Sequence, residues 1–500
     1  MGLAILKSRA ELGTEAPPVT IEVFLSGGLP TFSIVGMPET AVRESKDRVR
    51  GAILSSGFKF PQERITVNLG PADMPKTGGR FDLAIALGIL AAGKQIPVEA
   101  IRDIEFYGEL ALNGEIRPVR GVLPAALNAR AAGNSVLVAV ANGAEASLSK
   151  AETRVAKTML EVCAHFSAQH ELQPLQPIRP RGIAARHPDV IDVRGQAHAK
   201  RALEIAAAGG HNLLFIGPPG TGKSMLARRL PGILPPMSEA EALQTAAIDS
   251  VLGRRLDLEH WRQRPFRSPH HTASAAALVG GGSGPRPGEV SRAHNGVLFL
   301  DELPEFNRNV LEVLREPLEA GVITIARAAR QAEFPADFQL IAAMNPCPCG
   351  FLGDVSGECG CSADRVASYR GKISGPLLDR IDLQVEVGRP SKEALRTGCR
   401  SEETSAVIAA RVFKARTIQL QRAGVCNARL QGEALDTCCG LSGDCLELIE
   451  KAVDRFSLSA RAYHRVLRVA RTIADLAGAA MIMPPHIAEA LAMRLLDKRT

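Results

Sequence analysis

The residues best suited to chemistry form a glycine-rich loop, Gly217-Pro218-Pro219-Gly220-Thr221-Gly222-Lys223-Ser224. The short apolar stretch 212–216 predicts a strand before this loop, and a helix is predicted to begin at its end. In this context glycines let backbone N–H groups turn toward phosphates, and the helix N-terminus adds positive potential. We expect Lys223 to reach the β- and γ-phosphates of a nucleotide and Ser224 to bind Mg²⁺. A chance glycine-rich turn is the alternative, but the strand and the helix around the loop argue against it.

Two carboxylates, Asp301 and Glu302, follow a second apolar stretch at 296–300. The carboxyl ends of parallel strands meet at one edge of a sheet, and ligands bind at that edge. We therefore expect Asp301 to organise Mg²⁺ with its water molecule. Glu302 is expected to orient and deprotonate the water that attacks the γ-phosphate.

Two further polar residues complete this set. Asn345 follows the apolar stretch 338–344 and can hydrogen-bond the attacking water or the γ-phosphate, although an asparagine at a turn is the simpler interpretation. Arg380 lies just after an apolar helix end within 375–382. It can act on the nucleotide of a neighbouring subunit, where an arginine adds about 10³–10⁵ in rate. An ion pair with an adjacent aspartate is the alternative.

The elements that must position these groups fall into distinct segments. Residues 1–170 mix alternating apolar stretches with helical ones, which predicts an α+β domain. Residues 171–190 are proline-rich and predict a linker. Residues 191–390 alternate short strands with helices, which is typical of an α/β fold with a doubly wound, mainly parallel sheet. Residues 391–500 predict a helical C-terminal lid.

In their order, these motifs resemble the P-loop AAA+ ATPase superfamily. Between Lys223 and Asp301, the sequences at 266–274 and 285–291 resemble the magnesium-chelatase-type branch, which carries an extra insertion there. The resemblance implies that Arg461 is the sensor 2 arginine, which touches the γ-phosphate from the lid. Whether it acts on its own nucleotide or on a neighbour's stays open.

Related helicases place a hairpin before the strand that ends in a polar residue called sensor 1, whose position here is that of Asn345. By this resemblance, Arg327 and Arg330 lie on such a hairpin, and either is expected to contact a DNA phosphate. A solvated hairpin charge explains these residues equally well.

The N-terminal domain resembles the Lon protease domain at 75–84 and 108–119. Lon cleaves peptides with a serine that a lysine activates. In our alignment Arg80 stands at the serine position and Ala125 at the lysine position. We therefore expect a Lon-protease-like domain that lacks the Ser–Lys dyad and serves binding or assembly rather than proteolysis.

Four cysteines after Asn345, namely Cys347, Cys349, Cys359 and Cys361, form the pattern Cys-x-Cys-x₉-Cys-x-Cys. Four thiolates can close a tetrahedral Zn²⁺ site, although this spacing is tighter than that of zinc ribbons. A structural zinc ion would cross-link the loop between Asn345 and Arg380. A group of reduced thiols without a metal is the alternative.

The adjacent pair His270-His271 invites a metal interpretation as well. Adjacent side chains are expected to point apart, so we favour hydrogen bonding or a structural role near the nucleotide.

Composition sets broader limits. The 500 residues carry a net charge of +7 and are 46% hydrophobic, which fits about three globular domains. So mild a charge permits a nucleic-acid partner without requiring one. Aromatic residues make up 4% of the chain, which argues against base-stacking platforms for single strands. The sequence has no secretion signal and no long uncharged apolar run, so we expect a cytoplasmic protein without a membrane partner.

Over essentially its whole length, the chain resembles the ComM/YifB family of magnesium-chelatase-like AAA+ ATPases, including the motifs at 32–38 and 67–73. The resemblance implies a ring, a homo-hexamer, that binds ATP and Mg²⁺ and migrates branched DNA in recombination and natural transformation. Its expected partners are branched or single-stranded DNA and recombination proteins. The alternatives are a magnesium-chelatase motor subunit, which resembles the chain only from about residue 190, and an ATP-dependent regulator without DNA activity.

Overall fold

The computed structural model describes residues 2–178, 180, 187–281, 285–327, 330–354, 357–390, 403–456 and 458–494. The chain divides into two compact units. Unit 1 comprises Met1–Gly182, Leu243–Trp261 and Ala326–Phe334; unit 2 comprises Ile183–Ala242, Arg262–Ile325 and Pro335–Thr500. The predicted linker falls partly outside the described residues, since 179 and 181–186 are not among them.

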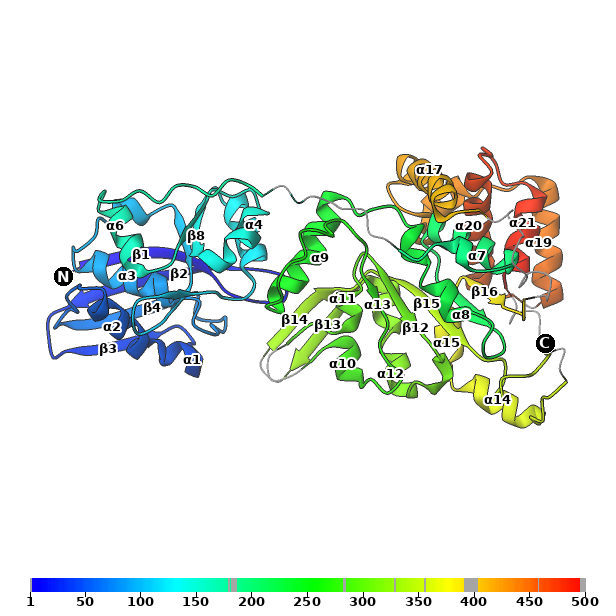
Figure 1. The fold of residues 1–500 in the computed structure, drawn as a ribbon, viewed down its shortest axis with the longest axis horizontal. Coiled ribbons are helices and arrows are strands. Elements are labelled where there is room, and N and C mark those ends of the chain that lie inside the picture. Colours follow the sequence, from blue (N-terminus) through cyan, green and yellow to red (C-terminus); the bar gives the residue numbers. More distant parts are fainter. Residues whose placement is uncertain are drawn as a thin grey trace. The chain divides into compact units, whose positions relative to one another are not determined.

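Unit 1 is built on a seven-stranded mixed sheet with the order β3-β4-β2-β1-β5-β8-β9 (Figure 1). Its strands are β1 (Gly2–Arg9), β2 (Pro18–Ser26), β3 (Thr31–Val35), β4 (Arg64–Gly70), β5 (Ile104–Tyr107), β8 (Ser135–Ala139) and β9 (Thr153–Ala156). Alternate residues of β2 are buried, as expected of a strand with one face against a core. That core is completed by helix α3 (Asp82–Ala92), whose every residue is buried and which packs on β1 and β2.

The remaining elements of unit 1 surround this sheet. They are α1 (Thr40–Arg43), α2 (Ser45–Ser55), β6 (Glu109–Leu110), β7 (Ile116–Arg117), α4 (Val122–Ala131), α5 (Gly143–Ser147) and α6 (Met159–Phe166). Unit 1 also takes in most of α9 (Glu239–Val251) and part of the hairpin β13 (Val322–Arg327) and β14 (Arg330–Pro335). Nothing in the sequence pattern indicates that these later segments pack with the N-terminal domain.

Unit 2 contains a five-stranded sheet in which every pairing is parallel, with the order β11-β12-β15-β10-β16. Its strands are β10 (Leu213–Ile216), β11 (Phe266–Arg267), β12 (Val297–Leu300), β15 (Gln339–Met344) and β16 (Leu383–Glu386). The predicted parallel α/β sheet is therefore confirmed. β10, β12 and β15 are buried throughout, as is typical of strands covered on both faces.

Helices of unit 2 connect these strands and form the C-terminal segment. Helix α7 (Ala197–Gly209) precedes β10, and the connecting helices are α8 (Lys223–Ala227), α10 (Ala275–Val279), α11 (Glu289–Arg292), α12 (Arg308–Glu312), α13 (Arg315–Ala320), α14 (Ala363–Gly371) and α15 (Gly375–Leu378). The C-terminal helices are α17 (Ser405–Ala423), α18 (Gly432–Cys438), α19 (Gly443–Phe456), α20 (Ala460–Leu476) and α21 (Pro484–Ala492). They pack on one another and, through α17 and α20, on α7 (Figure 1). No helix in the described part of the chain has the length and apolar character needed to cross a membrane.

Candidate functional site

The glycine-rich loop leaves the carboxyl end of β10 and enters α8, whose first residue is Lys223. Gly220 and Gly222 have φ angles of +77° and +89°, and no atom lies within 4 Å of where a Cβ would stand at either residue. Their left-handed backbone favours glycine and leaves open space beside the loop. The loop therefore has the shape of a cradle for phosphate groups.

The Lys223 ammonium bridges this loop and the neighbouring strand β15. Its Nζ donates to the carbonyl oxygens of Gly217 (2.7 Å) and Pro218 (2.8 Å) and to Oδ1 of Asn345 (3.1 Å). These acceptors are neutral, and burial lowers the pKa of Lys223 to about 8. A phosphate oxygen would supply the negative charge that a buried ammonium at this place favours.

A second pair links the loop to strand β12. Ser224 Oγ donates to Asp301 Oδ2 at 2.6 Å, and Asp301 Oδ1 accepts the N–H of Glu302 at 3.0 Å. A hydroxyl and a carboxylate on adjacent elements are the ligand set that Mg²⁺ uses beside a nucleotide. The residues present therefore fit ATP and Mg²⁺: the loop and Lys223 would hold the phosphates, and Ser224 and Asp301 the cation.

Glu302 is oriented by its backbone and by a histidine. Its φ of +52° is unusual for a residue with a side chain and turns it out of line with the strand. Its Oε2 lies 3.2 Å from Nδ1 of His271. The expectation that His270 and His271 point apart is wrong, because their ring centroids lie 4.2 Å apart. The expected role near the nucleotide loop agrees with the contact to Glu302.

Arg380 and Arg461 line a different site, a pocket of about 370 Å³. Arg429, Arg465 and Arg468 line it as well, together with Asn212, which directly precedes β10. The glycine-rich loop begins at the other end of β10, five residues further on, and at about 3.3 Å per residue the strand separates the two ends by about 17 Å. The five arginines thus lie at the amino end of the sheet, and the phosphate cradle lies at the carboxyl end.

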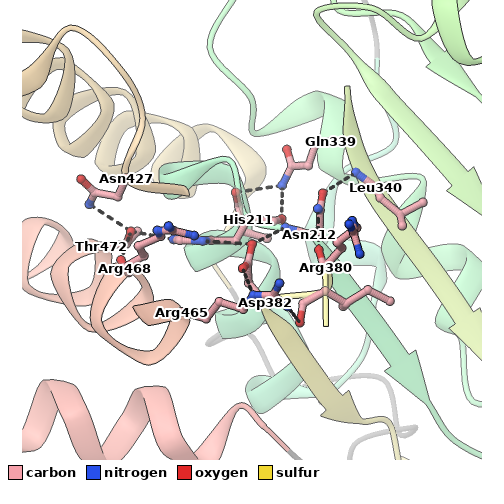
Figure 2. Close-up of polar contacts among 12 residues, drawn as sticks. His211, Asn212, Gln339, Leu340, Arg380, Asp382, Asn427, Arg465, Arg468 and Thr472 are labelled. Atoms are coloured by element: carbon pink, nitrogen blue, oxygen red, sulfur yellow. Dashed lines mark hydrogen bonds and ion pairs between the residues drawn. The ribbon is translucent and has the colours of Figure 1, made fainter. Parts of the chain in front are cut away.

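A buried polar network supports this pocket (Figure 2). The fully buried His211 pairs through Nε2 with Thr472 Oγ1 of α20 (2.8 Å), and its Nδ1 lies 3.4 Å from Oδ2 of Asp382. Asp382 also lies 3.7 Å from Arg465. Burial alone would raise the pKa of this carboxyl, but the contacts with His211 and Arg465 hold it below its usual value. The network ties helix α20 to the sheet and fixes the wall of the pocket.

Arg380 itself is held from several sides. It is 9% exposed; its guanidinium pairs with Glu319 and donates to the carbonyl oxygen of Pro376. Its own carbonyl accepts from Asn212 Nδ2 at 2.8 Å. The ion pair with an adjacent aspartate, considered from the sequence, is therefore replaced by one with Glu319 of α13, which is distant in sequence.

The four cysteines come together as expected. The Sγ atoms of Cys347, Cys349, Cys359 and Cys361 all lie within 4.8 Å of one another. Three of the Sγ–Sγ distances are 3.3, 3.6 and 3.7 Å. Tetrahedral Zn²⁺ with Zn–S bonds of about 2.3 Å sets thiolates about 3.8 Å apart, so the four residues fit a zinc ion.

The candidate DNA contacts Arg327 and Arg330 end β13 and begin β14, the two strands of a separate hairpin. The predicted hairpin before β15 is therefore present. The side chains of both arginines lie outside the described residues, and their contact with DNA stays a prediction.

Three family models match the chain. "Magnesium chelatase, subunit ChlI" covers residues 189–395, "Subunit ChlI of Mg-chelatase" covers 21–142, and "Magnesium chelatase, subunit ChlI C-terminal" covers 402–494. Competence protein ComM of Haemophilus influenzae is 51% identical over 99% of this chain and 98% of its own length. The chain belongs to the ComM/YifB family. The protein YifB of Salmonella typhimurium is 48% identical over 100% of this chain and 98% of its own length.

Two magnesium-chelatase subunits match less of the chain. The magnesium-chelatase 38 kDa subunit of Cereibacter sphaeroides is 25% identical over 39% of this chain and 57% of its own length. The magnesium-chelatase-type AAA+ family implies ATPase activity with ATP and Mg²⁺, in agreement with the geometry of the loop, Ser224 and Asp301.

Proposed function

We propose that this ComM/YifB protein is a ring-forming, ATP-dependent DNA motor that migrates branched DNA in recombination and natural transformation. The phosphate cradle and the five-arginine pocket lie at opposite ends of the sheet, and this separation supports the proposal of a ring. The relative from Haemophilus influenzae, a competence protein, supports the DNA part, and the AAA+ family supports the ring. Cytoplasmic localisation stays a prediction from the sequence.

The hydrolytic step follows from the carboxyl end of the sheet. Bound Mg²⁺ would neutralise charge on the phosphates. Lys223 holds the transferred phosphate, Asn345 helps to hold Lys223 and the attacking water, and Glu302 takes the proton of that water. His271 keeps the Glu302 carboxylate aimed, because the two side chains are in direct contact.

Arg380 and Arg461 complete the site of the neighbouring subunit. Neither can reach the γ-phosphate on its own chain's loop if the sheet stands between them, so both act in trans. In a ring with head-to-tail contacts, the arginine end of one subunit faces the phosphate end of the next. Two cationic side chains there would stabilise the charge that develops on the transferred phosphate.

The cysteine cluster is proposed as a structural zinc site. It lies in the loop between Asn345 and α14, and Cys347 is fully buried. Zinc would fix the path that the chain takes from the phosphate end of the sheet to Arg380. Metal analysis of purified protein that finds no zinc, with Cys347→Ser folding normally, would overturn this part.

The N-terminal domain is proposed as a Lon-like module without protease chemistry. At the two dyad positions, Arg80 is a buried cation and Ala125 is buried in the core. Neither side chain can serve as a nucleophile or activate one. A magnesium-chelatase motor subunit is the second candidate, since the chelatase models match residues 189–395 and 402–494 and also residues 21–142, before the start near residue 190 that we expected from the sequence. The chelatase relative itself, however, matches only 39% of this chain.

A labelled Holliday junction tests the motor proposal. With ATP and Mg²⁺ the wild-type protein should dissociate the junction, whereas Glu302→Gln should bind it without turnover. Because phosphate contacts dominate such binding, affinity should fall steeply with salt. If neither protein binds the junction at low salt, the DNA-motor proposal fails, while ATPase activity is judged separately.

A further inference from the structure

We propose that Arg468, together with Arg461, forms a phosphate-binding site inside the five-arginine pocket of unit 2. The ligand is a phosphate group, which comes either from a free phosphate ion or from the nucleotide on a neighbouring subunit. The pocket has a volume of about 370 Å³, within the usual range for sites that hold small ligands. The inference assigns a role to Arg468, which the proposed function does not use, and its second source of phosphate rests on that function.

The arginines of helix α20 that line the pocket lie on one face of the helix. Positions 461, 465 and 468 are four and three residues apart, and side chains at this spacing are neighbours on a helix surface. All three line the pocket, and Figure 2 shows Arg465 and Arg468 pointing from α20 toward the sheet. The hydrogen bond between His211 and Thr472 holds the same helix against the sheet, so this face is fixed as a wall of the pocket.

The positive charges of the pocket exceed the negative charges that neutralise them. Three of the five arginines have a carboxylate partner, namely Arg380 with Glu319, Arg429 with Asp337 and Arg465 with Asp382. Among the described residues, no carboxylate forms an ion pair with Arg461 or Arg468. Cations gathered in a partly buried pocket need compensating charge, and an anion that binds between Arg461 and Arg468 would supply it.

Two arginines of the pocket also have a buried N–H group without an acceptor. Nε of Arg468 is shielded from solvent and has no hydrogen-bond partner in the described part of the chain. The same is true of Nε of Arg380, whose side chain is 9% exposed. Buried polar groups of native proteins are almost always hydrogen-bonded. An arginine commonly binds a phosphate through two parallel N–H groups, so a phosphate in the pocket would provide the missing acceptors.

The cations around Arg468 repel one another. Burial lowers the pKa of Arg429 and of Arg465, and the nearby positive charge of Arg468 lowers both further. A phosphate group carries up to two negative charges and would attract all three guanidinium groups at once. The pocket is therefore electrostatically suited to an anion of this kind.

Binding of pyrophosphate to full-length Lys223→Ala protein tests the site when the phosphate cradle of the chain is disabled. With EDTA present to exclude Mg²⁺, calorimetric titration should show one pyrophosphate bound per chain. Adding Arg468→Gln should weaken this binding about tenfold or more, since a hydrogen bond to a charged group contributes on that scale. Adding Arg455→Gln instead, on an exposed arginine of α19, is the matched control and should leave the affinity unchanged.

Thermal unfolding separates ligand binding from a structural role of Arg468. In phosphate-free buffer, Lys223→Ala with Arg468→Gln should unfold at or above the midpoint of Lys223→Ala alone, because it lacks an unpaired cation that repels its neighbours. Pyrophosphate should then raise the midpoint of Lys223→Ala but not that of the double variant. Arg468→Lys keeps the charge without the planar guanidinium and should retain part of the response. A lower midpoint of the double variant in phosphate-free buffer would mark Arg468 as structural.

ATP turnover distinguishes the two sources of the phosphate group. If the group belongs to a neighbour's nucleotide, Arg468→Gln in otherwise wild-type protein should lower kcat about tenfold, with binding of a fluorescent nucleotide unchanged. If kcat stays unchanged although pyrophosphate binding is weakened, the ligand is a free phosphate.

One result overturns the inference and a different one overturns the proposed function. Equal affinity for pyrophosphate with and without Arg468→Gln removes the phosphate site from the pocket. An unchanged kcat in Arg380→Ala instead contradicts the proposed action on a neighbouring subunit. The pyrophosphate titration involves no ATP turnover, so it judges the pocket in either case.

Discussion

The two ends of one parallel sheet in unit 2 carry two different sets of polar side chains. The carboxyl end offers an open backbone cradle, a buried lysine and the Ser224–Asp301 pair. The amino end offers a pocket lined by five arginines and supported by the buried His211–Asp382 pair. The first set suits a nucleotide with its cation, and the second suits the charge that builds up during hydrolysis. Since the sheet separates them, the proposed function places a complete site between two copies of the chain.

Arg380→Ala should give the largest effect that distinguishes the two ends. We expect kcat for ATP to fall by about 10³ or more, because a trans arginine contributes that much, with nucleotide affinity almost unchanged. Steady-state hydrolysis and binding of a fluorescent nucleotide measure the two effects. Arg365→Ala, on an exposed arginine of α14, is the control. Loss of binding with retained kcat would contradict the assignment.

Glu302→Gln alters the carboxyl end of the sheet and should abolish ATP turnover. Loss of a general base lowers the rate by about 10²–10⁴, and ATP should remain bound because the cradle is intact. Filter binding of labelled ATP, alongside product release, checks both parts. Turnover at the wild-type rate would show that Glu302 is not the base.

Zinc removal should disturb the chain segment that joins the two ends. We expect Cys347→Ser to lower the unfolding midpoint by about 5–10 °C, given about 2–4 °C per kcal/mol in a domain of this size. Differential scanning calorimetry with zinc analysis measures this, and Cys163→Ser, a buried cysteine of unit 1, controls for loss of a buried thiol. Unchanged stability together with unchanged metal content would contradict the zinc site.

The pH dependence of nucleotide binding should report the protonation of Lys223 in the phosphate cradle. Burial lowers the pKa of Lys223 to about 8, so the free protein loses this charge as the pH rises through 8. Because phosphate binds the ammonium form, KM for ATP should rise up to about tenfold per pH unit above 8. Ser224→Ala should keep this dependence. A flat profile from pH 7 to 9.5 would contradict it.

His271→Ala should give the smallest effect, confined to the carboxyl end. Losing one orienting contact to Glu302 should lower kcat about fivefold with little change in KM. His271→Asn, which keeps a polar group, should recover part of the loss, and His198→Ala on an exposed histidine is the control. An unchanged kcat would show that the Glu302 backbone alone suffices.

The phosphate cradle at the carboxyl end of the sheet was predictable from the sequence, because each of its residues lies beside a short apolar stretch. The strands β10, β12 and β15 follow from apolar stretches, and Lys223, Asp301 and Asn345 stand directly at or after their ends. Parallel pairing then brings these residues together. The cysteine cluster was equally predictable, since its four residues lie within one short loop.

The arginine pocket at the amino end of the sheet depends on contacts between residues that are far apart in the sequence. The pairing of His211 with Thr472, and of Arg380 with Glu319, joins residues far apart in the chain. In the sequence nothing distinguishes Arg429, Arg465 and Arg468 from other surface charges, whereas the fold places all three around one pocket. The hydrogen bond from the Gly121 N–H to the Ser250 carbonyl oxygen within unit 1 was hidden for the same reason, because the two residues lie far apart in the sequence.

Mixing two inactive variants tests the two-copy site most directly. Lys223→Ala lacks a working cradle and Arg380→Ala lacks a working arginine, so neither variant alone should hydrolyse ATP. After the two are mixed and allowed to reassemble, random assortment in a head-to-tail ring should restore about a quarter of wild-type activity. Recovery near that level supports a site shared between the arginine end of one subunit and the phosphate end of the next. Assembled mixtures that stay inactive would contradict it.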